Sequence, residues 1–305
     1  MIHFSHPALA DYRARPPHPD RRDGGRLARG GAPKPGTAAQ PLVTIVIAVR
    51  NGERHLEGAL QSVLAQTYPS VELVIADGAS TDGTLAILQR HDDQIDRWIS
   101  EPDAGAFDGM NRGIALASGR FVKIHGHDDL MPPDSVATAV ETFFRAEAEA
   151  DDVVVRSDME IIDARDAVLH RVGPGNGRRW SPAILHPTWY VPRRIYERFG
   201  LYDPSSAASS DYELFFHLRA NGVTFRHADR PLAQFRVGGL STTTLSGLRD
   251  GFVINRHYMN GAVATYLLGL AGGRAFARMG LERIVGTDRS NRVRQWVKRA
   301  LGESM

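Results

Sequence analysis

The stretch F-V-K-I-H-G-H-D-D, residues 121–129, decides the fold that we expect for this chain. Its apolar part, Phe121 to Ile124, is typical of a buried strand, and the strand ends in two adjacent carboxylates, Asp128 and Asp129. In an open α/β sheet, ligands bind outside the carboxyl ends of the strands. Carboxylate oxygens suit Mg²⁺ or Mn²⁺, and a cation held there can neutralise a diphosphate. The stretch therefore predicts a metal and ligand site, and a solvated Asp-Asp turn is the alternative.

Composition indicates a globular protein with an ordinary core. The 305 residues are 42% hydrophobic and 24% charged, which is enough apolar material for one large domain. Because the chain has no cysteine, a disulfide framework and cysteine-ligated zinc are excluded. The net charge is only +2, so no nucleic-acid partner is expected. No signal-peptide core and no run of ~20 apolar residues occurs, so we expect a cytoplasmic protein.

Apolar strands alternate with helices on either side of residues 121–129. Residues 1–40, rich in proline, glycine and arginine, predict an irregular basic arm in solvent. Strands expected at 42–49, 71–76 and 97–100 precede the central one, each followed by a helical pattern, which predicts a mostly parallel sheet. The polar loops after these strands then converge at one edge. Mutual repulsion among their carboxylates favours a bound cation, and the carboxylates concerned are Asp77, Asp103, Asp108, Asp128 and Asp129.

The second half of the chain carries further signals. Residues 159–171 read as a hairpin that turns at 164–166, and residues 231–237 read as an edge strand. The block 186–194, H-P-T-W-Y-V-P-R-R, contains too many special residues for a plain connector. Asp211 opens a helix, where a carboxylate is favoured by the helix dipole, so a structural role competes with a catalytic one.

The carboxyl-terminal tail reads as helical from about residue 250. Its last helix has an apolar face flanked by basic side chains, a pattern that suits anionic lipid and equally suits packing on the chain's own domain. The apolar face consists of Val293, Trp296, Val297 and Leu301, and the flanking residues are Arg292, Arg294, Lys298 and Arg299.

Taken together, these segments resemble the family 2 glycosyltransferases, and more narrowly the bacterial branch that builds lipopolysaccharide O-antigen and exopolysaccharide. The resemblance covers roughly residues 41–241. It rests on the order and spacing of the strand into Arg50-Asn51, D-G-A-S-T-D-G-T, S-E-P-D-A-G-A-F-D-G-M-N-R-G, H-D-D-L, H-P-T and S-D-Y-E-L. It implies a GT-A fold over residues 41–245, with a nucleotide-binding sheet flanked by helices and a carboxyl-terminal acceptor-binding part. Residues 246–305 would then form a helical tail.

The activity that the resemblance implies is inverting transfer of a sugar, hexosyl in type, from a nucleotide diphosphate sugar. The expected donor is a UDP-sugar, and the expected acceptor is a saccharide or a lipid-linked molecule in cell-surface polysaccharide synthesis. Such an acceptor would place the protein at the inner membrane face, where the basic tail helix could contact the membrane surface.

The resemblance also implies roles for individual residues. Asp211 resembles the general base that takes the acceptor hydroxyl's proton, and Asp77 resembles the aspartate that hydrogen-bonds the nucleobase. Asp129 is the expected ligand of Mn²⁺ or Mg²⁺, which would stabilise the departing diphosphate. His127 stands where the family more often has Asp, Ser or Ala, and both metal ligation and a ribose contact stay open for it. The expected donor-binding residues are Val49, Asn51, Asp77, Asp103, Asp108, Asn111, His127 and Asp128, and the candidates for acceptor or diphosphate contacts are His186 and Arg236.

Three alternatives compete with this interpretation. His125, His127 and Asp129 open an H-x-H-x-D-H signature of metal-dependent hydrolases, although Leu130 occupies the last position. A nucleotidyltransferase would share the fold class, but no glycine-rich loop with a following lysine comes after the first strand. A non-catalytic sugar-nucleotide-binding or scaffold protein would keep the fold without needing Asp211. The sugar, the nucleotide, the acceptor and the oligomeric state stay open.

Overall fold

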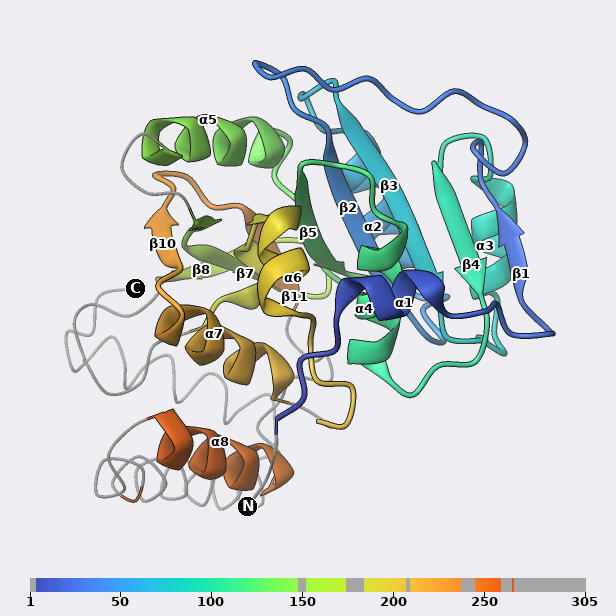
Figure 1. The fold of residues 1–305 in the computed structure, drawn as a ribbon. Helices are drawn as coiled ribbons and strands as arrows, with labels where there is room; N and C mark the ends of the chain where they lie inside the picture. Colours follow the sequence, from blue (N-terminus) through green and yellow to red (C-terminus); the bar gives the residue numbers. More distant parts are fainter. Residues whose placement is uncertain are drawn as a thin grey trace, which may run out of the picture.

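The structure, a computed structural model, describes residues 4–147, 152–173, 184–206, 209–236, 245–258 and 265. Figure 1 shows a large twisted sheet with helices on both faces, and beside it a second part built from short strands and helices. The strands are β1 (Arg22–Gly24), β2 (Val43–Val49), β3 (Val71–Asp77), β4 (Arg97–Ser100), β5 (Phe121–Gly126), β6 (Val153–Arg156), β7 (Met159–Ile162), β8 (Val168–Val172), β9 (Val191–Pro192), β10 (Thr224–His227) and β11 (Ala233–Arg236). The helices are α1 (Leu9–Ala14), α2 (Leu56–Leu64), α3 (Thr84–Arg90), α4 (Ala106–Leu116), α5 (Ser135–Glu147), η1 (His186–Thr188), α6 (Arg193–Phe199), α7 (Ser210–Ala220) and α8 (Leu245–Tyr258).

The large sheet has the order β1-β4-β3-β2-β5-β9, and its four central strands are parallel. This confirms the mostly parallel sheet that the alternation of strands and helices predicts. Val49 pairs with Asp77, and Ala48 pairs with Gly126, so β2, β3 and β5 end at one level. The loops after these strands therefore emerge side by side at one edge.

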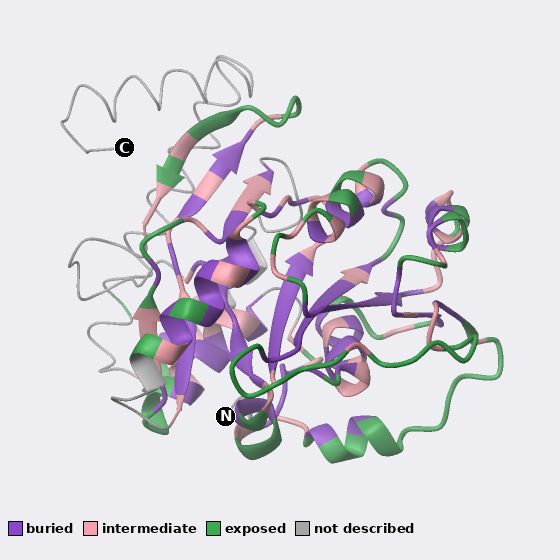
Figure 2. Cartoon of the chain, turned by 90° about the horizontal axis from the view of Figure 1, so that it is seen from above, coloured by how far each residue is buried: buried purple, intermediate pink, exposed green. Residues whose placement is uncertain are grey.

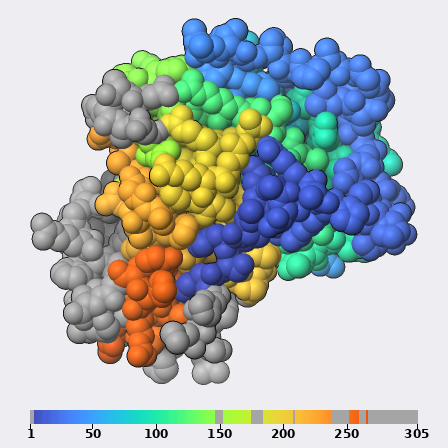
Figure 3. Space-filling model, viewed as in Figure 1, coloured from blue at the N-terminus to red at the C-terminus, as the bar shows by residue number. Residues whose placement is uncertain are grey.

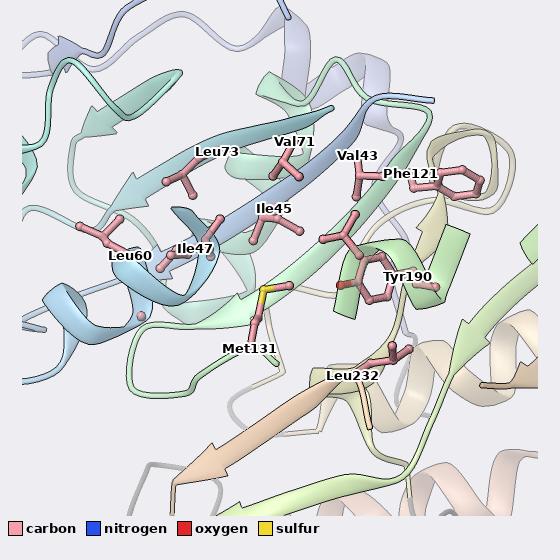
Figure 4. Close-up of a cluster of buried hydrophobic side chains, with 14 of the residues drawn as sticks. Val43, Ile45, Ile47, Leu60, Val71, Leu73, Phe121, Met131, Tyr190 and Leu232 are labelled. Carbon is pink, nitrogen blue, oxygen red and sulfur yellow. The ribbon is translucent and has the colours of Figure 1, made fainter. Parts of the chain in front are cut away.

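Strand β2 forms the centre of the core because both of its faces are covered. Ile45 and Ile47 face a cluster that includes Leu60 of α2, and Val46 faces a second cluster with residues of α4, α6 and α7. Figure 2 shows the central strands as buried, and Figure 4 shows the first cluster in detail. Met131 lies in the same cluster and is 3% exposed, so it anchors the segment that follows the two carboxylates.

The second part of the molecule supports the edge of the large sheet. β7 and β8 form the expected hairpin, and Asp166 in its turn has a φ of 65°. β11 pairs with β7 and is an edge strand, as expected for residues 231–237. Leu130 also exchanges two backbone hydrogen bonds with Gln234 of β11, each 2.9 Å. β11 therefore lies directly beside the carboxyl end of the 121–129 stretch.

The amino-terminal arm is packed against the fold, and the expectation of a solvated tail is wrong. Leu9 and Tyr12, one turn apart on α1, are 2% and 5% exposed, and β1 pairs with β4 at the sheet edge. Arg26 and Lys34 both pair with Asp96, whose side chain is fully buried. Figure 3 shows the arm in dark blue against the yellow and orange segments. Two buried apolar residues, a short strand and scattered ion pairs and hydrogen bonds anchor the described part of the arm, a signal too sparse to produce a periodic sequence pattern.

The described part of the tail is α8, which agrees with a helix in this region. The basic amphipathic residues 291–301 and the moderately apolar segment 262–270 lie outside the described residues, apart from residue 265. Of the helices that the structure describes, none is both long enough and apolar enough to cross a membrane.

Candidate functional site

Asp77 is the last residue of β3, and its carboxylate accepts hydrogen bonds from neighbouring residues. The residue is 2% exposed, and its Oδ2 accepts from the Ser100 hydroxyl at 2.6 Å and from the Ser80 backbone N–H at 3.1 Å. The Ser80 hydroxyl donates to Oδ1. Because an ionised carboxylate can accept about four hydrogen bonds, these three contacts leave room for one more donor.

The loop after β2 lies against this aspartate. Gly78 N–H donates to the carbonyl of Val49 at 2.8 Å. Asn51 has a φ of 55°, and its side-chain oxygen accepts from the Thr81 N–H at 2.9 Å. Its own N–H donates to the Ser80 hydroxyl at 2.7 Å. The structure thus brings together the residues expected to flank a nucleobase.

Asp103 approaches the same strand end from the loop after β4. A methyl group on Gly78 would lie 2.5 Å from Asp103 Oδ2, so the glycine allows this close approach without a shift of the aspartate side chain. Oδ1 accepts from the Gly105 N–H at 3.0 Å, and burial raises the pKa of the Asp103 carboxyl. Asp103 therefore lies at the edge where the sequence places it.

Asp108 and Asn111 on α4 are engaged by the protein itself. Asp108 is 3% exposed and accepts four hydrogen bonds, two of them from Tyr12 at 2.6 Å and Arg15 at 3.0 Å of the arm. The other two come from the Ala104 N–H and the Arg112 guanidinium. Asn111 is fully buried and exchanges two hydrogen bonds with the backbone of Tyr202. These contacts support a structural role for both side chains, in place of the expected contact with the nucleotide-sugar donor.

The carboxylates of Asp128 and Asp129 converge above the end of β5. A methyl group on Gly126 would collide with Asp129 Oδ2 and would lie 3.2 Å from Asp128 Oδ1. His127 packs against the loop after β2, because a methyl group on Gly52 would lie 3.0 Å from its Cδ2. Glycines at positions 52 and 126 therefore let two loops and two carboxylates share a small volume.

Asp129 is the buried member of the pair. It is 2% exposed, and its Oδ1 accepts from the Arg236 backbone N–H at 3.0 Å. Burial and the neighbouring charge of Asp128 raise the pKa of Asp129 to about 7. Such a carboxylate is only about half ionised at neutral pH, and a bound cation would favour its ionised form. Asp129 Oδ2 and Asp128 Oδ1 both lie close to Gly126, and two neighbouring carboxylates are a donor set that fits a divalent cation.

Arg236 holds the two parts of the molecule together at this point. Its guanidinium donates to the carbonyls of Asp128 and Asp163, each at 2.9 Å, and pairs with the Asp166 carboxylate at 2.5 Å. The residue is 9% exposed. These observed contacts position the 128–129 segment, and the expected contact with acceptor or diphosphate stays a prediction.

His186 contacts Tyr202, and Asp211 interacts electrostatically with the same residue. His186 Nε2 lies 2.7 Å from the Tyr202 hydroxyl, and burial lowers the pKa of His186 to about 3, so its ring is neutral. Burial, the neighbouring Tyr196 and the charge of Asp211 all raise the pKa of the Tyr202 hydroxyl. Asp211 itself is partly exposed at the start of α7, and burial raises its pKa to about 6. Its Oδ1 accepts from the Tyr212 N–H at 2.8 Å, a local contact that leaves other lone pairs of the carboxylate available.

Lys123 is a functional candidate that sequence reasoning missed. It is fully buried on β5, its Nζ donates to the Pro187 carbonyl beside His186, and it interacts electrostatically with Asp129. Burial lowers the pKa of Lys123 to about 7. The signal in the sequence was a lysine within an apolar strand. Burial of a charged side chain costs free energy unless the charge is paired or hydrogen-bonded, so such a lysine suggests a specific role. Lys123 therefore contacts the H-P-T segment through the Pro187 carbonyl and interacts electrostatically with Asp129.

His125 does not share the position of His127. It is 1% exposed within the sheet, and its ring nitrogens make no well-formed hydrogen bond with the described residues. Burial holds the pKa of His125 well below its usual range. The hydrolase signature needs both histidines at one accessible metal site, so this burial counts against that alternative.

A hollow of about 530 Å³ lies at the opposite edge of the sheet. Its lining includes Leu42, just before β2, and Arg120, just before β5. These positions mark the amino ends of the parallel strands, away from every candidate site residue at the carboxyl ends. The hollow is therefore separate from the carboxylate edge of the sheet.

Comparison with known proteins agrees with this geometry. Residues 44–208 match the family described as Glycosyl transferase family 2, which is more than half of the chain. The chain belongs to glycosyl transferase family 2. An uncharacterized glycosyltransferase of Rickettsia typhi is 30% identical over 217 residues, an alignment covering 67% of this chain and 66% of that family member. A second, from Mycobacterium tuberculosis, is 39% identical over 103 residues, covering 33% of this chain and 39% of the relative.

Solved structures agree on the fold. S. aureus TarS 1-349 in complex with UDP-GlcNAc superposes with a TM-score of 0.56 at 16% identity, covering 80% of this chain and 76% of that chain. The same fragment of TarS in complex with UDP gives a TM-score of 0.54 at 15% identity, covering 84% and 78%. The fold of this family 2 protein is GT-A-like, with a mostly parallel central sheet flanked by helices.

Proposed function

We propose that this protein transfers a sugar, hexosyl in type, from a UDP-sugar to a saccharide or lipid-linked acceptor, with inversion at the anomeric carbon. The observation that carries the proposal is the meeting of two groups at one sheet edge, the loops around Asp77 and the Asp128-Asp129 pair, with Asp211 at the start of α7 as the candidate base. Family membership supports a glycosyltransferase activity. The TarS structures with UDP and UDP-GlcNAc support a uridine nucleotide as the donor.

The nucleobase would bind between Asp77 and the loop after β2. A carboxylate with one free acceptor position selects a base that presents an N–H, as uracil does at N3. The backbone of Val49 to Asn51 would flank the same ring, since hydrogen bonds to Gly78, Ser80 and Thr81 already hold that loop in place. Asp103 would close the pocket from the β4 side.

Asp129 would hold a divalent cation, Mn²⁺ or Mg²⁺, together with Asp128. When bound, this cation would neutralise the charge that develops on the departing diphosphate. His127 would either complete the ligand set or contact the ribose, and its position against Gly52 is compatible with both. Lys123 would keep the buried end of Asp129 in an electropositive environment.

Asp211 would act as the general base. The acceptor hydroxyl must lose its proton while it attacks the anomeric carbon from the face opposite the nucleotide. With its pKa raised to about 6, the Asp211 carboxylate is ionised at neutral pH and is a stronger base than an ordinary aspartate. His186, hydrogen-bonded to Tyr202, would hold the wall of the acceptor side in place.

Calorimetry with UDP, GDP, dTDP and ADP, each with and without Mn²⁺, tests the donor side. We expect UDP to bind most tightly, and chelation or Asp129→Ala to weaken UDP binding at least about tenfold. Asp229→Ala, at a carboxylate that is 83% exposed, is the control and should bind as the wild type does. Unchanged affinity after chelation would remove the metal from the proposal. Binding of none of the four nucleotides would overturn the donor site itself, whereas a preference for dTDP or GDP would change only the donor.

We further propose that the basic carboxyl-terminal segment, residues 291–301, holds the enzyme at the inner membrane face, where lipid-linked acceptors for cell-surface polysaccharides occur. The support is the Trp296 face flanked by basic residues in the sequence. Flotation with anionic liposomes should capture the full chain and lose a chain cut before Asn291. Equal capture of both chains would argue against the tail as an anchor.

A further inference from the structure

A second cluster of metal-ligand side chains lies where the amino-terminal arm meets α7. His6 of the arm and Glu213 and His217 of α7 each place one ligand atom so that all three lie within 4.8 Å of one another. His6 Nε2 is 3.0 Å from Glu213 Oε2, and the rings of His6 and His217 stack with centroids 3.9 Å apart. None of these residues belongs to the strand-end site.

The arm is held in this position by contacts that aim His6 at α7. Ser5 N–H donates to Asp203 Oδ2 at 3.1 Å, and Leu201 N–H donates to the Pro7 carbonyl at 3.0 Å. Gly200, with a φ of +88°, makes room for the histidine, because a methyl group there would lie 2.7 Å from His6 Cβ. These contacts give this part of the arm a defined place against α7.

Glu213 is a buried carboxylate with an incomplete set of partners. Its side chain is 1% exposed, its Oε1 accepts from the Tyr258 hydroxyl, and Oε2 has no hydrogen-bond partner among the described residues. Its Oε2 lies 3.0 Å from His6 Nε2, and a buried carboxylate oxygen at that distance is stabilised by a positive charge. Either a protonated His6 or a metal ion would supply that charge.

The second histidine distinguishes the two possibilities. His6 Nδ1 lies 3.0 Å from the Leu201 carbonyl, and His217 Nε2 lies 3.1 Å from the Phe199 carbonyl. A carbonyl accepts only from an N–H, so each ring carries its proton on the nitrogen that faces the backbone, and each offers a lone pair on the other. Metal-binding histidines show the same arrangement, with the outer ring nitrogen donating to a carbonyl. An ion pair between His6 and Glu213 would have no use for the His217 lone pair.

We infer that His6, Glu213 and His217 bind a zinc ion that fastens the amino-terminal arm to α7. Two imidazoles and one carboxylate are a common zinc ligand set, and they suit Mg²⁺ poorly. Ligand atoms of a tetrahedral zinc lie about 3.3 Å apart, a spacing that falls between the observed 3.0 Å and the 4.8 Å limit of the cluster. Because α7 begins next to Asp211, the zinc would also stabilise the helix that carries the proposed base.

The test uses the full chain with Asp129→Ala as background, which removes the cation site at the strand ends. After chelation and dialysis, zinc content is measured by mass spectrometry, and zinc is titrated against a colorimetric indicator and against the melting temperature. We expect one zinc per chain and a rise of about 4 °C at a hundredfold excess over Kd. His6→Ala and His217→Ala should each weaken zinc binding at least about a hundredfold.

His18→Ala is the matched control, because His18 belongs to the same arm and its side chain is 41% exposed beside Asp20. It should bind zinc as the background chain does. If His217→Ala does not fold, His217→Asn keeps a donor for the Phe199 carbonyl and should still lose zinc. A background chain that binds no zinc, or one that binds it equally well after the change at His217, would leave a plain ion pair and overturn the inference. Bound iron in place of zinc would overturn the choice of metal.

Discussion

Two roles compete at Asp211, and its contacts allow them to be separated. As a helix-terminal carboxylate it would contribute about 1 kcal/mol of stability, whereas a general base contributes typically 10²- to 10⁴-fold to the rate. We expect Asp211→Asn to fold, to bind UDP as the wild type does and to transfer sugar at least about a hundredfold more slowly, measured as kcat on a UDP-sugar. Asp229→Asn should be unaffected. Near-normal turnover would assign Asp211 to structure, and Glu213 is not the obvious replacement, because it is buried and held by His6 and Tyr258.

The pH dependence of the rate gives an independent measurement on the same residue. Burial raises the pKa of Asp211 to about 6, and a base must be deprotonated to act. The value of kcat/KM should therefore fall as the pH drops below about 6, and should be about tenfold lower at pH 5 than at pH 7. The residual activity of Asp211→Asn should lack this step. A wild-type profile that is flat between pH 5 and 7 would contradict the assignment.

At the scale of elements, Arg236 decides how β11 is joined to the end of β5. Its planar guanidinium donates hydrogen bonds to the Asp128 and Asp163 carbonyls at the same time. The single ammonium group of lysine cannot reproduce this geometry. We expect Arg236→Lys to lower the free energy of unfolding by about 1 to 3 kcal/mol in urea titrations. Asp166→Asn removes only an ion-pair partner that is 55% exposed, and should cost less than about 1 kcal/mol.

The consequence for the site follows from the same contacts. Because the Arg236 backbone N–H donates to Asp129 Oδ1, loosening β11 should also weaken metal-dependent UDP binding. An Arg236→Lys protein of wild-type stability would show that the clamp is dispensable. Wild-type stability with lost UDP affinity would instead favour a direct contact of Arg236 with the diphosphate.

At the scale of the whole molecule, the arm joins the large sheet to the second part. Tyr12 donates to Asp108 of α4 in a buried hydrogen bond, and α1 also packs against α6. We expect Tyr12→Phe to lower the free energy of unfolding by about 1 to 3 kcal/mol, because a buried carboxylate loses a donor. Arg15→Gln removes a partner that is 45% exposed from the same carboxylate, and should cost less than about 1 kcal/mol. UDP affinity should not change in either variant, and a clear loss would return Asp108 to the donor pocket.

Local patterns in the sequence were sufficient for the sheet and for the position of the site. The β-branched run of β2 is buried on both faces, and helices between the strands make the sheet parallel, so the chain order alone places the strand ends at one edge. Asp77, Asp103, Asp128 and Asp129 follow from that rule. The hairpin turn at 164–166 likewise follows from residues that are neighbours in the chain.

What the tertiary structure alone decided are pairings between residues far apart in the chain. The motif around Asp108 predicts that this residue contacts the nucleotide-sugar donor. In the structure its oxygens accept hydrogen bonds from Tyr12, 96 residues away, and from other side chains. The arm reads as solvated, yet it supplies His6 to the Glu213-His217 cluster. No periodicity in a sequence reports such contacts, because they depend on which surfaces meet after the strands and helices have packed. The sequence by itself determined the sheet and its carboxylate edge, and the packing determined which polar groups remain free to act there.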